Sequence, residues 1–173
     1  FTGTGSAHAE NYSGTLDTAP GMFFNLRTDS AGEGLIFHES LGNTKGLVSS
    51  TAAAAATVST WWNNTSPTTT QFTVGTSATV NNNTSPYIHY AWANSGPFLF
   101  GVYDSNLNAD GPMINLSGSP ATFGAKRNDG SWNWVQASQI LGDNENYQYL
   151  IPNATTAMNT TASVNEVDFL SNG

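Results

Sequence analysis

The sequence predicts an all-β protein with little helix: a β-sandwich, of the jelly-roll or concanavalin-like type, built from two related halves. Three observations support this fold class. Short segments alternate polar and apolar residues with a period of two, turn-forming residues separate these segments at spacings typical of sandwiches, and one segment recurs about 100 residues further along the chain. A chain of 173 residues is long enough to bury one sizeable core.

The period-two pattern places strands along the chain. Met22, Phe24 and Leu26 share one face of the first strand, because successive side chains of a strand point to opposite faces. The same pattern predicts strands over 22–27, 35–38, 87–92 and 132–134. Asp129–Gly130 is the best candidate for a hairpin turn. The alanine-rich run 52–56 lacks an amphipathic stripe, so it predicts a brief helix or a tight loop.

The internal repeat divides the chain into a first unit, 1–100, and a second, incomplete unit, 101–173, packed together as one sandwich domain. The matching positions are Pro20 and Pro120, Phe23 and Phe123, Arg27 and Arg127, Asp29 and Asp129, and Leu41–Gly42 and Leu141–Gly142. The strand-like segment 87–93 has no counterpart in the second copy. We expect either that the chain is a fragment, which we favour, or that a neighbouring subunit supplies this strand.

Composition excludes several function classes. Only 9% of the residues are charged, and the net charge of −8 would repel a nucleic acid. No apolar stretch reaches the roughly 20 residues that cross a bilayer, so we expect no membrane insertion. The chain has no cysteine, so it contains neither a disulfide nor a thiolate metal site.

Enzymatic activity is not expected, because nearly all of the acidic residues lie in turn segments beside Gly, Asn or Ser, where they are typical of solvated loops rather than of a catalytic pair. The three histidines are far apart in the sequence and form no ligand-spaced motif, so we expect no cofactor. One loop is rich in oxygen atoms and predicts either a calcium site or a set of Asx turns. Its alternating residues are Asp104, Asn106, Asn108 and Asp110.

Carbohydrate contact needs exposed aromatic rings for stacking and amides for hydrogen bonds. Two segments combine these groups, and the candidate residues are Trp61, Trp62, Asn63 and Trp132. The alternative is that these tryptophans belong to the core or to an interface, as is common in sandwiches. Arg27 and Arg127 each stand two residues before an aspartate, which predicts a charged hydrogen bond that fixes a turn.

Several motifs, taken together and in order, resemble a repeated domain of large structural proteins in marine tailed bacteriophages, usually described as tail fibre or virion proteins. In the first unit these motifs are 18–24, 37–42, 62–68 and 87–93, and in the second they are 100–103, 109–112, 126–129 with Trp134, and 167–173. The resemblance covers most of the chain. It carries no catalytic residue.

The resemblance implies a non-enzymatic virion structural protein, part of a tail fibre or appendage on the particle surface, that contacts glycans of the host surface. Its partners would be other virion proteins and further copies of itself, with a trimer as the expected assembly. Three alternatives remain open: a self-assembling filament or capsid decoration subunit, a lectin-like carbohydrate-binding module, and a glycan depolymerase.

Overall fold

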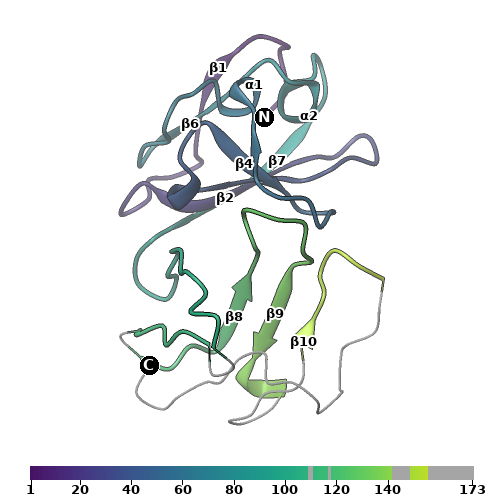
Figure 1. Ribbon diagram of the computed structural model, residues 1–173. Helices are drawn as coiled ribbons and strands as arrows, with labels where there is room; N and C mark the ends of the chain where they lie inside the picture. The colour runs from purple at the N-terminus through teal and green to yellow at the C-terminus, as the bar shows by residue number, and fades with distance from the viewer. Residues whose placement is uncertain (109–110, 117, 142–148, 156–173) are drawn as a thin grey trace. The chain divides into compact units, whose positions relative to one another are not determined.

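The computed structural model describes residues 1–108, 111–116, 118–141 and 149–155 (Figure 1). The chain divides into two compact units, Phe1–Val102 and Tyr103–Gly173. Both are built from antiparallel strands, which confirms the all-β fold, whereas the jelly-roll or concanavalin-like type stays a prediction. Among the described residues, no helix has the length and apolar character that crossing a membrane requires.

The first unit contains a five-stranded antiparallel sheet in the order β5-β4-β3-β2-β7. Its strands are β2 (Pro20–Arg27), β3 (Leu35–His38), β4 (Lys45–Val48), β5 (Ala56–Thr57) and β7 (Tyr87–Ala93). The alternation predicted for 22–27 is present, since Phe23 and Asn25 are buried while Met22 and Phe24 are only half-buried. Strands predicted at 35–38 and 87–92 are also confirmed.

A smaller sheet lies across the core from this one. It pairs β1 (His8–Asn11) with β6 (Gln71–Val74), and two single-turn helices accompany it, α1 (Ser59–Trp62) and α2 (Ala78–Asn81). The Ser77 hydroxyl caps α2 by accepting a hydrogen bond from the backbone N–H of Thr79 at 3.3 Å. Asn63 ends α1 in the left-handed conformation (φ 51°), which asparagine tolerates better than most residues.

The core of the first unit is aromatic. The ring of Phe23 lies parallel to that of Phe37, with centroids 4.7 Å apart, and meets the indole of Trp62 edge-on at 4.8 Å. Phe72 of β6 packs against Phe23 from the smaller sheet, with centroids 5.8 Å apart. These contacts join both sheets and α1 around one apolar cluster, whose buried members are Phe23, Leu35, Phe37, Trp62, Phe72, Val74 and Val80.

The second unit contains a three-stranded antiparallel sheet in the order β10-β9-β8 (Figure 1). Its strands are β8 (Thr122–Ala125), β9 (Val135–Ser138) and β10 (Tyr149–Leu150), and a short 3-10 turn, Gln139–Leu141, follows β9. The strand predicted at 132–134 is wrong, because these residues belong to the loop before β9. The run 52–56 forms no helix: residues 52–55 are a loop and Ala56 begins β5, so the loop alternative was correct.

The two units share one hairpin. In the first, Phe23 pairs with Phe37 and Asn25 with Leu35, and a 3-10 turn, Glu39–Leu41, follows β3. In the second, every pair is shifted by 100 residues: Phe123 is opposite Ala137 and Ala125 is opposite Val135. The repeated sequence therefore folds into the same strand pairing twice. Of the matching positions, Gly142 lies outside the described residues.

Candidate functional site

Each shared hairpin has a loop that an arginine and an aspartate hold in shape. In the first loop, residues 28–34, Nε of Arg27 donates to Asp29 Oδ1 at 2.5 Å and Nη2 donates to Asp29 Oδ2 at 3.2 Å. In the second loop, residues 126–134, the same atoms of Arg127 and Asp129 lie at 2.5 and 3.3 Å. Two parallel hydrogen bonds fix both the distance and the plane of the pair. We call each pair an Arg–Asp clamp.

The clamps lie on the surface, and within each one the arginine stabilises the ionised form of the aspartate. The hydrogen bond from Arg27 lowers the pKa of the Asp29 carboxyl, and the bond from Arg127 does the same for the pKa of Asp129. Both aspartates are therefore ionised at neutral pH. Because the pairs are exposed to solvent and salt, they order the loops more than they stabilise the fold.

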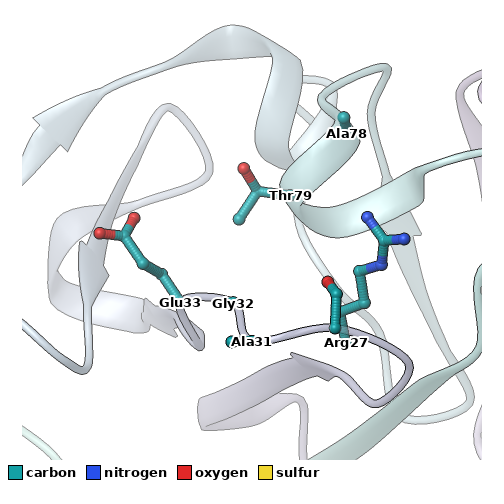
Figure 2. Close-up of a pocket in the computed structure, with 7 residues that line it drawn as sticks. Arg27, Ala31, Gly32, Glu33, Ala78 and Thr79 are labelled. Carbon is teal, nitrogen blue, oxygen red and sulfur yellow. The ribbon is translucent and has the colours of Figure 1, made fainter.

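The first loop borders a groove of about 260 Å³. Figure 2 shows Thr79 of α2 facing the part of the loop that carries Gly32 and Glu33, with the side chains of Arg27 and Glu33 on opposite sides of the view. The tip of this loop is small, since it reads Ala31-Gly32-Glu33-Gly34. It presents no aromatic ring.

The second loop has a different tip, Ser131-Trp132-Asn133-Trp134. The side chain of Trp132 is 62% exposed, which is unusual for so large an apolar group. Next to it, Asn153 Nδ2 donates to Asn133 Oδ1 at 3.0 Å, and Asn153 Oδ1 accepts from the backbone N–H of Trp134 at 2.8 Å. An exposed indole thus stands beside an ordered pair of amides.

A second groove, of about 270 Å³, lies along β7. One wall is anchored by the N–H of Leu16, which donates to the Thr69 carbonyl at 2.9 Å. The other is fixed by Asn94, whose amide donates to the Phe100 carbonyl and accepts from the Phe100 N–H, each at 3.0 Å. The lining residues are Thr15, Leu16, Asp17, Ala91, Trp92, Ala93, Ser95, Pro97 and Phe98. Sequence reasoning missed this groove, because its walls come from distant parts of the chain.

Comparison with known proteins places the chain in a family. The model of a domain of unknown function, DUF7483, matches residues 1–173. The chain belongs to the DUF7483 family. No curated protein and no solved structure matches it.

The glycan candidates of this DUF7483 chain separate into buried and exposed residues. Trp62 is 1% exposed, and its indole N–H donates to the Lys45 carbonyl at 3.1 Å. Trp62 is therefore removed from the predicted glycan contacts, because a tryptophan enclosed in the core has no ring face free for a sugar. Trp61 is half-buried and covers Gly46, where an added Cβ would lie 2.8 Å from the indole. Asn63 is exposed, and of the candidate tryptophans only Trp132 is widely open to solvent.

The proposed calcium loop of the DUF7483 chain is only partly described, since Asp110 lies outside the described residues. Within the described part, Asn106 Oδ1 accepts the backbone N–H of Asn108 at 3.0 Å, which is an Asx turn, and Asn106 Nδ2 donates to the Gly111 carbonyl. Asp104 is exposed. The described ranges bring no three His, Cys, Asp or Glu side chains together in a group that could hold a metal ion.

Proposed function

We propose that this chain is a non-enzymatic structural module of a phage tail fibre or related virion appendage, and that it contacts glycans of the host surface through Trp132. The observation that carries the glycan contact is the exposed indole beside the ordered amides of Asn133 and Asn153. The resemblance of the sequence to virion proteins supports the setting, which is the surface of the particle.

The chemistry of the loop suits a neutral sugar. A flat indole face packs against the apolar C–H face of a sugar ring, and amides donate to and accept from its hydroxyl groups. The Arg–Asp clamp orders the loop before any ligand arrives, which lowers the entropic cost of binding. The low content of charged residues, 9%, favours a neutral partner over a strongly charged one.

The proposal includes self-association and contact with other virion proteins. Self-association is supported by the open strand edges described below, and a trimer is the assembly that the resemblance implies. A lectin-like module that acts as a single chain is the second reading, because the Trp132 loop alone supplies the sugar contact.

The test is binding of the whole chain to purified host-surface polysaccharides on a glycan array, followed by calorimetry with the best ligand. Trp132→Ala should weaken binding at least about tenfold, the effect of losing roughly 1.4 kcal/mol of contact. Trp132→Phe keeps an aromatic ring, so its affinity for the glycan should lie between that of the unchanged chain and that of Trp132→Ala. Ile140→Ala is the matched control, because Ile140 is 92% exposed in the same unit but lies outside the loop. Equal binding by Trp132→Ala and the unchanged chain would refute the glycan contact.

A further inference from the structure

The five-stranded sheet of the first unit and the three-stranded sheet of the second each end in a strand with an open edge. In the described residues, β7 is the last strand of the five-stranded sheet and β8 is the last strand of the three-stranded sheet. An open strand edge carries backbone N–H and C=O groups that can pair with another strand. In the shared hairpin, β8 occupies the position that β2 has in the first unit. The edge of β2 that faces away from β3 pairs with β7 over seven positions. The corresponding edge of β8 is open among the described strands.

Hydrogen bonds identify which residues of β7 face outward along the sheet. Tyr87 N–H donates to the Phe1 carbonyl at 2.9 Å, and Phe1 N donates to the Tyr87 carbonyl at 3.1 Å, so the backbone groups of Tyr87 point away from β2. In an antiparallel ladder this direction alternates from residue to residue. The groups of His89, Ala91 and Ala93 therefore point the same way, and they form the open part of the edge, beyond the pair of Phe1 with Tyr87.

The same argument applies to β8. Gln139 N–H donates to the Ala121 carbonyl at 3.2 Å, which continues the register of β8 with β9 by one position. Residues 121, 123 and 125 therefore direct their backbone groups to β9. Those of Thr122 and Gly124 point to the open edge.

These directions match the apolar faces of the two strands. Residues directly opposite each other in a ladder share a face, so Thr122 and Gly124 would share one with Ala91 and Ala93. On the other face, the half-buried side chains Phe123 and Ala125 would meet Ile88, Tyr90 and Trp92, of which Ile88 is 45% exposed and Tyr90 49%. The match holds in every register that satisfies the hydrogen bonds, because such registers differ by two residues.

The groove beside β7 provides room for an incoming strand. Three consecutive residues of β7, Ala91, Trp92 and Ala93, line it. Neighbouring side chains of a strand point to opposite faces, so a groove that touches all three runs along the edge. Leu16 and Phe98 on its walls provide apolar contacts on either side.

We propose that β7 of one copy pairs antiparallel with β8 of a second copy, with the incoming strand seated in the groove beside β7. The proposal rests on the self-association in the proposed function and assigns it a surface. The contact joins two different surfaces, so it builds head-to-tail assemblies, which close into a ring or grow as an open chain according to the rotation between copies.

The first experiment measures the mass of the assembled species by size-exclusion chromatography with light scattering, over a hundredfold range of concentration. Gly124→Pro removes an edge N–H, and an added Cβ at Gly124 meets no atom within 4 Å, so the variant should fold. We expect it to run as a single chain, with loss of the larger species. Gly124→Ala, the matched control, keeps the N–H and should assemble like the unchanged chain.

The outcomes separate the two proposals. If the unchanged chain is a single copy at every concentration, both self-association and the edge contact are overturned, while glycan binding through Trp132 stands. If the unchanged chain assembles and Gly124→Pro assembles equally well, the edge contact alone is overturned.

A second experiment uses the absence of cysteine from the sequence. Copies with Tyr90→Cys are mixed with copies carrying Ala125→Cys or Phe123→Cys and are oxidised. Opposite residues of a non-hydrogen-bonded pair are close enough for a disulfide, so one of the two mixtures should give a linked dimer of the two variants. Ile140→Cys replaces the β8 variant in the control mixture. Linkage no greater than in that control would contradict the pairing.

Discussion

The imidazole of His89 lies parallel to the phenyl ring of Phe72, with the ring centroids 3.6 Å apart and the planes at 9°. Tyr12 stacks near the same imidazole, and Phe23 packs against it at 4.8 Å. Neither ring nitrogen of His89 has a hydrogen-bond partner among the described residues. Burial lowers the pKa of His89 to about 3. The ring is therefore neutral in the folded chain at physiological pH.

This burial makes the stability of the first unit sensitive to acid. In the unfolded chain the pKa of His89 returns to about 6.5, so the unfolded state takes up a proton first as the pH falls. The stabilisation is fully present above about pH 6.5 and is lost towards pH 3, by up to about 1.4 kcal/mol per pH unit. Urea unfolding between pH 7.5 and 4.5 measures this slope. His89→Phe should flatten it, and an unchanged slope in that variant would assign the acid sensitivity to other groups.

Asn81 is fully buried, and its side chain ties α2 to two other backbone segments of the first unit, residues 4–6 and Gly75. Its Nδ2 donates to the carbonyls of Ser6 and Gly75, and its Oδ1 accepts from the N–H of Thr4, all at 2.7 Å. Asn81→Ala leaves these groups unpaired, so we expect a loss of about 3 kcal/mol in the free energy of unfolding. Asn43→Ala, which removes an exposed amide, should cost less than about 0.5 kcal/mol. Similar losses in the two variants would contradict the argument.

Truncation of Trp62 should lower the free energy of unfolding strongly, whereas truncation of Trp132 should barely change it. Trp62→Ala leaves a cavity in the aromatic core and an unpaired Lys45 carbonyl, with an expected loss of about 3–5 kcal/mol. Trp132→Ala should change the free energy of unfolding by less than about 0.5 kcal/mol, because its ring is mostly in water. Guanidinium unfolding monitored by circular dichroism measures both. A large loss in Trp132→Ala would mean that the ring has a structural role.

The Arg–Asp clamp of the second loop should matter for binding more than for folding. Asp129→Asn removes the carboxylate that accepts both hydrogen bonds from Arg127. We expect an unchanged unfolding midpoint and weaker glycan binding, because the loop must then be ordered when the ligand binds. Asp29→Asn makes the same change in the first loop and should leave glycan binding unaffected. If the two substitutions changed glycan binding equally, the clamp of the second loop would have no specific role in the glycan contact.

Local patterns were sufficient to predict three strands of the first unit, β2, β3 and β7. The alternation at Met22–Phe24 and at Tyr90–Trp92 indicated β2 and β7, because a strand with one buried face repeats every two residues. The match of Arg27 with Arg127, each two residues before an aspartate, predicted a charged hydrogen bond in both copies, and both bonds are present. What local patterns could not supply was the burial of each tryptophan.

The burial of Trp62 depends on contacts distant in sequence. α1 is a single turn without an amphipathic stripe, so nothing in its own residues showed that Trp62 would meet Phe23 and Phe37. The segment 132–134 alternates like a strand, yet it forms a loop whose shape depends on Asn153, 20 residues away from Asn133. The groove beside β7 could not be predicted for the same reason, since Leu16 and Phe98 line it together only in the folded chain.

The two clamped loops show that one hairpin accepts tips of very different size. The strand register and the Arg–Asp pair are the same around Ala31-Gly32-Glu33-Gly34 as around Ser131-Trp132-Asn133-Trp134. The tip is thus free to change without disturbing the strands that hold it, which makes this hairpin a natural frame for grafting. A library of tips built into either loop would change what the surface recognises while the protein keeps its fold.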